Sequence, residues 1–269
     1  MSDIQIVTSR ENPRAKRLDL LLRQKKARDE SGLFVLEGAR LCLDSTAAGL
    51  RPESVYLTPS AMQRNPGLAA MVRVSPRTVW LDEGLAARLG DTASPQGVFA
   101  VLKKPAHVSV EISERGKYIL LYRVRDPGNL GGILRTAAAL GADGAFLCEC
   151  AELYSPKVLR ASMGGVWRFP VLDVENMAEQ VNALRRSEVE VYAAADKNGA
   201  LSPGCLAGAG GKAVLIGNEG DGLPDSLIAA CGGGVAIPMK NGSESLNAAM
   251  AAGILLWEML RHDGNGGAI

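Results

Sequence analysis

The stretch that decides the fold of this chain is AVLIGNEGDGLP, residues Ala213–Pro224. An apolar run typical of a buried strand leads directly into a turn rich in Gly, Asn and Glu. Because Gly has no Cβ, such a turn can bring backbone N–H and C=O groups close to a polar small molecule. The stretch therefore predicts a strand that ends in a ligand-binding turn.

Two other regions repeat this arrangement. YILLYRV (Tyr118–Val124) precedes DPGNLGGILRTAAALG (Asp126–Gly141), and VAIPM (Val235–Met239) precedes GSESLNAAMAAGILLWEML (Gly242–Leu260). The three turns carry side chains capable of chemistry, namely Arg135, Glu219, and Ser245 with Asn247. One Gly-rich turn is weak support for a site, but three of them predict a shared ligand site.

Strand-like and helix-like patterns alternate along the whole chain, which predicts an α/β fold in two domains. We expect a small α/β domain over residues 1–104, a polar linker over 105–117 and a second α/β domain over 118–269. In the first domain we expect a basic helix over 10–28, a strand over 54–57, a helix over 60–70 and a strand over 72–74. In the second we expect a strand over 166–171, a helix over 177–186 and a last helix over 245–261 that Ser245 can cap.

Composition excludes several classes of protein. The chain has 269 residues, of which 47% are apolar, enough for sizeable cores. No apolar run approaches the ~20 residues of a membrane span, and the first residues lack the pattern of a secretory signal. Five cysteines in no framework spacing suit a reducing cytoplasm, and two histidines make a metal site unexpected.

Charge is concentrated near the N-terminus. Between Arg10 and Arg28 there are eight basic and two acidic residues, although the whole chain carries only +1. Such a density of cations on a helix favours contact with a phosphate backbone, and a solvated helix face is the equally weighted alternative.

Familiar nucleotide and hydrolase motifs are absent. The chain contains no GxxxxGK[ST], and GNEGDG has the spacing GxxGxG, which differs from the dinucleotide fingerprint. No serine lies in GxSxG, and no Asp/Glu cluster of the kind that holds magnesium occurs.

The three motifs together resemble those of the SpoU (TrmH) family of RNA ribose 2′-O-methyltransferases, within the SPOUT superfamily. RASMGGVWRFPV (Arg160–Val171) resembles the segment that follows the first motif in that family. SRENPRAKRL (Ser9–Leu18) and GLFVLEGARL (Gly32–Leu41) are similar to a substrate-binding domain related to ribosomal RNA-binding proteins. The resemblance spans residues 118–261 at full strength.

The resemblance implies a C-terminal SPOUT catalytic domain with a trefoil knot, S-adenosylmethionine as cofactor, no metal and a homodimer. The motifs imply five catalytic-site residues: Asn129, Arg135, Glu219, Ser245 and Asn247. Arg135 is expected to pair with a substrate phosphate and stabilise the developing alkoxide, because a guanidinium pKa above ~12 argues against a role as base.

Further residues match binding positions of the family. The cofactor-binding matches are Gly217, Asn218, Gly220, Ile237, Met239 and Leu246. The RNA-binding matches are Arg10, Asn12, Lys16 and Glu37. Glu244, directly before Ser245, adds a negative charge near the expected path of the substrate phosphate.

The implied function is methyl transfer to a ribose 2′-OH of RNA in the cytoplasm, with ribosomal RNA favoured over transfer RNA. A transfer RNA methyltransferase and a non-catalytic RNA-binding module that retains the fold are the alternatives. The sequence identifies neither the nucleotide nor the RNA, and it leaves base methylation open.

Overall fold

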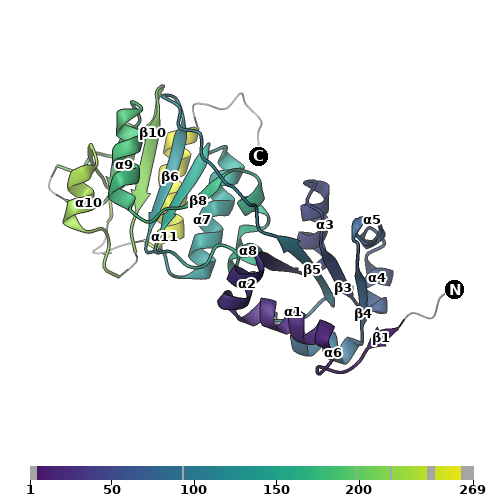
Figure 1. Cartoon of the computed structure of the whole chain (residues 1–269). Coiled ribbons are helices and arrows are strands. Elements are labelled where there is room, and N and C mark those ends of the chain that lie inside the picture. The colour runs from purple at the N-terminus through teal and green to yellow at the C-terminus, as the bar shows by residue number, and fades with distance from the viewer. Residues whose placement is uncertain (1–4, 93, 198, 219, 241–245, 262–269) are drawn as a thin grey trace. The chain divides into compact units, whose positions relative to one another are not determined.

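The computed structural model describes residues 5–92, 94–197, 199–218, 220–240 and 246–261 (Figure 1). The chain forms two compact units. The first unit contains Met1–Ala106 together with Tyr154–Gly164, and the second contains His107–Leu153 together with Gly165–Ile269. Each unit has its own sheet and is described in turn.

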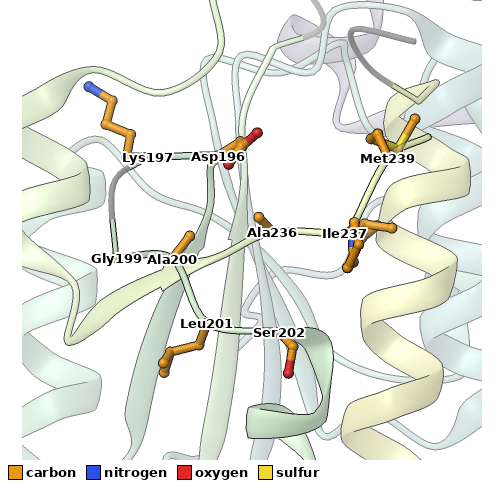
Figure 2. A pocket seen from close by; sticks show the side chains of 10 residues that line it. Asp196, Lys197, Gly199, Ala200, Leu201, Ser202, Ala236, Ile237 and Met239 are labelled. Carbon is orange, nitrogen blue, oxygen red and sulfur yellow. The ribbon is translucent and has the colours of Figure 1, made fainter. Parts of the chain in front are cut away.

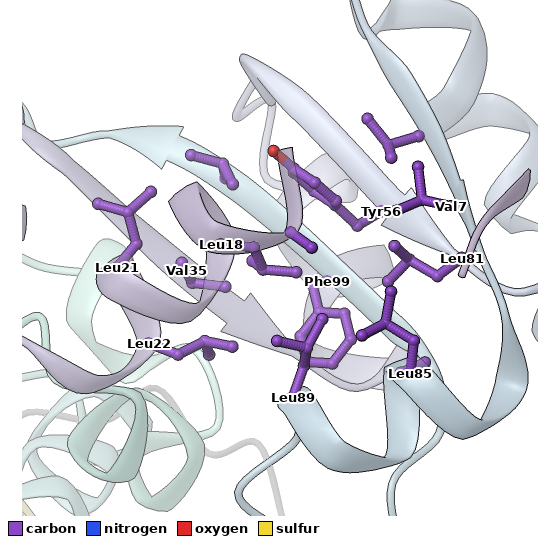
Figure 3. Packing of buried hydrophobic residues seen from close by; sticks show 14 of the residues in the cluster. Val7, Leu18, Leu21, Leu22, Val35, Tyr56, Leu81, Leu85, Leu89 and Phe99 are labelled. Atoms are coloured by element: carbon purple, nitrogen blue, oxygen red, sulfur yellow. The ribbon is translucent and has the colours of Figure 1, made fainter. Parts of the chain in front are cut away.

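The first unit is built on a five-stranded mixed sheet. Its strand order is β1 (Ile6–Val7), β4 (Thr78–Leu81), β3 (Ser54–Leu57), β5 (Val98–Lys103) and β2 (Leu33–Glu37). β5 runs antiparallel to β2 and β3, whereas β1 and β3 pair with β4 in parallel. Leu18, Leu21 and Leu22 pack against Val35 and Phe99 of this sheet, so α1 (Pro13–Arg23) covers the core (Figure 3).

The predicted basic helix is two helices. α1 ends at Gln24, whose extended backbone (φ −116°, ψ 118°) separates it from α2 (Lys25–Ser31). Arg28, counted among the cations that would face RNA, is buried and donates from Nη1 to the Leu21 carbonyl over 2.6 Å. Its charge therefore stabilises the end of α1.

Helices complete the first unit, and one prediction within them is wrong. The helix expected over 60–70 is interrupted, and α5 (Leu68–Val74) includes the residues expected to form a strand at 72–74. Val72 and Val74 favour a strand locally, but the buried side chains of Leu68 and Met71 have a helical spacing that overrides this propensity. The other helices are α3 (Ala39–Ala47), α4 (Pro59–Arg64) and α6 (Glu83–Leu89).

One helix of the first unit comes from much later in the chain. α8 (Pro156–Ser162) contacts β2, and the Tyr154 ring lies 5.0 Å from that of Phe34. Lys104 Nζ lies 5.4 Å from the Tyr154 ring centroid. These aromatic and cation–π contacts tie residues 154–164, which the sequence analysis placed in the C-terminal domain, to the first unit.

The second unit is built on a six-stranded sheet in which every described pair is parallel. The order is β11 (Gly233–Val235), β9 (Glu190–Ala194), β10 (Lys212–Ile216), β6 (Lys117–Tyr122), β7 (Gly144–Cys148) and β8 (Val171–Asp173). α9 (Met177–Arg186) and α10 (Asp225–Ala230) pack on one face, and α7 (Pro127–Leu140) and α11 (Ala248–Leu260) lie on the other (Figure 1). All carboxyl ends of the strands meet at one edge.

Two expected elements of the second unit begin later than predicted. Residues Gly165–Trp167 form a 3₁₀ turn, η1, so the strand expected over 166–171 is reduced to β8. A Cβ on Gly165 would lie 3.0 Å from Arg135 Cα, which shows how closely this turn packs on α7. The last helix is capped by Asn247, whose Oδ1 accepts from the N–H groups of Ala249 and Met250. Ser245, the predicted cap, lies outside the described residues.

The segment that includes β11 is hydrogen-bonded on both sides by one stretch of chain. Val235 O accepts from the Ala195 N–H over 3.1 Å on one side. On the other side, the Leu201 N–H donates to Gly234 O over 2.9 Å and the Ala236 N–H donates to Leu201 O over 3.0 Å. The segment 234–236 therefore lies between Ala195 and Leu201.

Candidate functional site

The first and third motifs meet at the N-termini of α7 and α11. Asp126 caps α7 by accepting from the Asn129 N–H over 2.8 Å. Asn247 Nδ2 donates to Asn129 Oδ1 over 3.0 Å, although these residues are 118 positions apart. The close approach is possible because the helices face each other through small side chains: a Cβ on Gly132 would lie 3.7 Å from Ala249 Cβ. Two predicted catalytic-site residues are thus in direct contact.

Arg135 lies about two turns further along α7 and is exposed to solvent. Its backbone is supported by Gly165 of η1, since a Cβ at that position would lie 3.0 Å from Leu134 O. Within the described part of the chain, its guanidinium forms no ion pair. Its five donors are therefore open to an anionic ligand.

The second motif forms a compact turn after β10. A Cβ on Gly217 would lie 2.6 Å from Gly222 O, so the turn closes only around glycine. Asn218 Oδ1 accepts from the Gly220 N–H over 2.7 Å, and its Nδ2 donates to Arg123 O over 2.9 Å. Asn218 therefore organises the turn with its own side chain. Glu219 lies outside the described residues.

Arg123 and Glu149 form a pair that the sequence analysis did not single out. They follow β6 and β7 at the same edge, and both have left-handed backbones, with φ values of 58° and 54°. Arg123 Nε lies 2.8 Å from Glu149 Oε2, and this hydrogen bond lowers the pKa of Glu149. Non-glycine residues in this conformation are strained and gather at functional sites. The only sequence signal was their position after a strand.

A cavity of about 590 Å³ opens beside this edge of the second unit (Figure 2). It combines apolar side chains with the carboxylate of Asp196, the ammonium of Lys197 and the hydroxyl of Ser202. Its lining residues are Asp196, Lys197, Gly199, Ala200, Leu201, Ser202, Ala236, Ile237, Pro238 and Met239.

Two of the six predicted cofactor-binding residues, Ile237 and Met239, line this cavity. The lining does not include Gly217, Asn218 and Gly220, and it does not include Leu246, which is exposed.

Six lining residues, at 196–197 and 199–202, were not predicted from the sequence. They follow β9 directly, so the rule that ligands bind beyond the carboxyl ends of parallel strands could have found them. Lys197 pairs with Asp225, and Figure 2 shows its side chain turned away from Met239.

The predicted RNA-binding residues lie in the first unit, and three of them take part in α1 or the segment before it. Arg10 Nη2 lies 3.0 Å from Asp19 Oδ2, and Lys16 pairs with Glu11. Asn12 caps α1 by accepting from the Arg14 N–H over 2.9 Å. Arg10 and Lys16 are therefore exposed but already paired with carboxylates, which reduces their attraction for phosphate.

Glu37, the fourth, is not at the surface, because its side chain is only 2% exposed. Its carboxylate accepts from Arg160 Nη1 over 3.0 Å, from Thr92 Oγ1 over 3.0 Å and from the Asp91 N–H. Arg160 Nη2 also lies 3.0 Å from Asp91 Oδ2. The buried carboxylate of Glu37 therefore holds α8 to β2 through Arg160. Its role is structural, and not the RNA binding that the sequence predicted.

The described residues contain no group of three or more His, Cys, Asp or Glu that could hold a metal ion. Among them there is also no helix both long and apolar enough to pass through a membrane. The cysteine thiols Cys150 and Cys231 are shielded, and burial raises the pKa of each to about 11.

Comparison with known proteins gives this geometry a family. The sequence pattern of the SpoU rRNA methylase family matches residues 116–257, and that of the MRM3-like substrate-binding domain matches residues 12–100. The chain belongs to the SpoU rRNA methylase family. The recognition made from the three motifs is thereby confirmed.

Three relatives of this SpoU chain are informative. The 23S rRNA (guanosine(2553)-2′-O)-methyltransferase of Bacillus subtilis is 28% identical over 88% of this chain and 92% of its own length. The 23S rRNA (uridine(2479)-2′-O)-methyltransferase of Streptomyces viridochromogenes is 30% identical, covering 95% and 91%. The AdoMet-bound rRNA methyltransferase from Sinorhizobium meliloti has a TM-score of 0.82 at 31% identity, covering 96% and 98%. The α/β fold with its SpoU parallel sheet and its N-terminal substrate-binding domain is therefore shared with these proteins.

Proposed function

We propose that this SpoU protein transfers a methyl group from S-adenosylmethionine to a ribose 2′-OH of ribosomal RNA. The observation that carries the proposal is the Asn129–Asn247 hydrogen bond of 3.0 Å, which joins the first and third motifs. It lies in the unit that also presents the open guanidinium of Arg135 and the cavity of about 590 Å³. Enzymes need such a convergence of distant residues to bind a reacting group in one orientation.

The cavity suits S-adenosylmethionine in size and chemistry. Its volume falls in the ~300–1,000 Å³ range of small-molecule sites. Ile237 and Met239 offer apolar surface to an adenine ring, and the Asp196 carboxylate offers an opposite charge to an ammonium or sulfonium group. The two 23S rRNA enzymes and the AdoMet-bound structure support this choice of cofactor and reaction.

Arg135 is the proposed catalytic residue. When bound, S-adenosylmethionine supplies an electrophilic methyl group on a positively charged sulfur. A ribose hydroxyl is a poor nucleophile until it loses its proton. A guanidinium has only donors, so the role proposed for Arg135 is electrostatic. We propose that it pairs with a substrate phosphate and stabilises the charge that develops on the 2′-oxygen, while water or the phosphate accepts the proton.

The remaining motif residues are proposed to hold the loops and the substrate. Asn129 and Asn247 fix the relative position of α7 and α11. Gly217, Asn218 and Gly220 shape the motif-two turn. Glu219, Ser245 and Leu246 keep the roles that the family resemblance implies.

Ribosomal RNA is the preferred substrate in this proposal because both 23S rRNA enzymes align with most of the chain. One of those relatives is named for a guanosine and the other for a uridine, so the proposal covers the ribose and not a particular base. The domain over 1–104 is proposed to bind the RNA through its exposed cations, and the domain over 118–269 to carry the chemistry.

We also propose a cytoplasmic homodimer with a knotted catalytic domain. Three apolar side chains of α11 support the dimer, because Met250, Ile254 and Trp257 are 63%, 38% and 48% exposed. Hydrogen bonds on both sides of residues 234–236 support the knot, since the chain there lies between Ala195 and Leu201.

Labelled S-adenosylmethionine tests the proposal directly. The wild-type protein and Arg135→Ala are incubated with unmodified 23S rRNA, intact large subunits and transfer RNA, and the RNA is digested with alkali. Ribose methylation should place the label in alkali-resistant dinucleotides from ribosomal RNA. Arg135→Ala should reduce kcat by about 10²–10³-fold, the usual effect of losing one stabilising donor.

The other outcomes separate the alternatives. Label in mononucleotides would show base methylation. Label in transfer RNA alone would show that transfer RNA, and not ribosomal RNA, is the substrate. Binding of S-adenosylmethionine without transfer to any of the three RNAs contradicts the proposed substrate. No cofactor binding contradicts the enzyme itself and favours a non-catalytic RNA-binding module.

A further inference from the structure

The residue that follows β6 contacts the ends of both neighbouring strands. In the sheet of the second unit, β6 lies between β10 and β7. Arg123 comes directly after β6, and its N–H donates to the carbonyl of Cys148, the last residue of β7, over 2.9 Å. On the other side, its own carbonyl accepts from Asn218 Nδ2, beyond β10, over 2.9 Å. The backbone of Arg123 therefore connects β7 to the motif-two turn.

The side chain of Asn218 extends this connection into the turn. Its Oδ1 accepts from the Gly220 N–H over 2.7 Å and from the Asp221 N–H over 3.1 Å. The donor and acceptor atoms of Asn belong to one planar amide group, so they move together. The carbonyl of Arg123 thus fixes, through Asn218, the position of two backbone amides of the motif-two turn.

Arg123 makes both backbone hydrogen bonds in a left-handed conformation, with a φ of 58°. For a residue that has a Cβ, this conformation is disfavoured by a population factor of about 5–30. A residue in it returns to an ordinary conformation unless other contacts hold it there. The carbonyl that anchors Asn218 would move with that change.

Contacts of the Arg123 side chain offset this cost. Its Nε donates to Glu149 Oε2 over 2.8 Å, and its Nη2 donates to Glu149 Oε1 over 3.2 Å. The guanidinium carbon also lies 4.9 Å from the centroid of the Tyr122 ring. A bidentate pair fixes the orientation of the guanidinium as well as its position. The pair therefore restrains the backbone to which the guanidinium is attached.

We propose that Arg123 is a positioning residue of the cofactor site, which holds the motif-two turn through Asn218 and is itself held in its left-handed conformation by Glu149. The inference rests on the proposed function, in which this turn belongs to the S-adenosylmethionine site. It assigns Arg123 a role in the affinity for the cofactor that requires no contact between its side chain and the cofactor or the RNA.

Two substitutions at position 123 separate the backbone from the side chain. Arg123→Ala removes the guanidinium and keeps a Cβ, so the left-handed conformation loses its support. The Kd for S-adenosylmethionine, measured by calorimetry, should rise about 5–30-fold. Arg123→Gly removes the same side-chain contacts, but glycine adopts positive φ about as readily as negative φ. Its Kd should therefore stay within about twofold of the wild-type value.

Steady-state kinetics with ribosomal RNA give a second measurement. In Arg123→Ala the KM for S-adenosylmethionine should rise, whereas kcat at saturating cofactor should change by less than about twofold, because Arg123 does not touch the reacting atoms. An equal rise of Kd in Arg123→Ala and Arg123→Gly would show that the guanidinium itself binds the ligand. That result would overturn the proposal, as would an unchanged Kd in Arg123→Ala.

Glu188 provides the matched control. Its backbone is also left-handed, with a φ of 61°, but it precedes β9 and so lies at the opposite edge of the parallel sheet. Glu188→Ala and Glu188→Gly should leave the Kd for S-adenosylmethionine unchanged, with the glycine variant the more stable of the two. If Glu188→Ala raised Kd as much as Arg123→Ala, the effect would be one of general stability and the proposal would be overturned.

Amide hydrogen exchange without cofactor separates this inference from the proposed function. The Gly220 and Asp221 amides should exchange faster in Arg123→Ala than in the wild type and Arg123→Gly. This pattern, in a wild-type protein that binds no S-adenosylmethionine, would support the positioning of the turn and contradict the proposed function. Methyl transfer by the wild type, with exchange and Kd unchanged in Arg123→Ala, would refute only the role of Arg123. Thermal unfolding checks that each variant is folded.

Discussion

The two sheets of this protein place their functional residues in different ways. In the second unit every described strand pair is parallel, so the turns after β6, β9 and β10 all emerge at one edge. In the first unit β5 runs antiparallel to β2 and β3, which sends successive connections to opposite edges. A parallel sheet gathers distant motifs into a single site, whereas the mixed sheet leaves its candidate ligand contacts on helices that cover it.

The comparison also concerns charge. The first unit buries the Glu37 carboxylate against Arg160 and pairs several of its surface cations, among them Arg10 and Lys16, with carboxylates. The second unit leaves Arg135 open and keeps a strained pair, Arg123–Glu149, at its site edge. The Glu37–Arg160 pair thus stabilises the fold of the first unit, whereas Arg135 of the second unit is available to a ligand. The following substitutions test that difference.

The largest effect is expected for Arg160→Ala. The substitution leaves the Glu37 carboxylate buried without its cation, and breaking such a pair costs about 3–5 kcal/mol of unfolding free energy. Because Arg160 is 23% exposed, we expect a value near the lower limit. Urea unfolding measures it. In Arg17→Ala, the control, the broken pair with Glu53 is more exposed, and the loss should stay below about 1 kcal/mol. Similar losses would show that Glu37–Arg160 is not the structural pair inferred here.

Gly217→Ala should have the next largest effect on stability. The new Cβ would lie 2.6 Å from Gly222 O and 2.8 Å from Leu223 Cγ, so the motif-two turn must open. Overpacking of this kind costs about 1–3 kcal/mol. Affinity for S-adenosylmethionine, measured by calorimetry, should fall with it. Gly204→Ala is the control, since its nearest neighbour is 3.9 Å away, and an equal fall there would contradict the argument.

Asn247→Ala should separate a cap from a site contact. Asn247 and Asn176 cap α11 and α9 with the same two hydrogen bonds, to the second and third N–H groups that follow. Each alanine variant should lose about 1 kcal/mol of stability. Only Asn247→Ala also breaks the bond to Asn129, so only it should lower kcat in the methyl-transfer assay. Equal kcat in both variants would reduce the Asn129–Asn247 contact to a structural role.

The smallest effect is expected for Glu149→Gln. Arg123 lowers the pKa of Glu149 from its ordinary value of 4.5, so the pair stabilises the fold above that pH and its contribution disappears as pH falls through the lowered pKa. Thermal unfolding should show a small loss at pH 7 that vanishes in acid. Glu114→Gln is the control, because Glu114 lies 4.0 Å from Arg115. If the loss of thermal stability in Glu149→Gln were the same at every pH, the ion pair with Arg123 would be excluded as its cause.

Much of this architecture could be predicted locally. The strand at 54–57 and the helix at 177–186 have the predicted bounds, because an apolar run or an amphipathic period is a property of neighbouring residues. The strand at 72–74 failed because two buried side chains of α5 decided the conformation. The strand expected from 166 failed because Gly165 packs against the α7 backbone, a contact with residues 30 positions earlier.

The residues of the candidate site also differ in whether local sequence or tertiary packing determines them. The sequence by itself determined the family, the motif residues and their order, since these depend on residue types at fixed spacings. Only the tertiary structure brought Asn129 to Asn247, buried Glu37 beneath α8 and opened the cavity after β9. Contacts between residues a hundred or more positions apart depend on how whole elements pack, and local patterns carry no information about that packing.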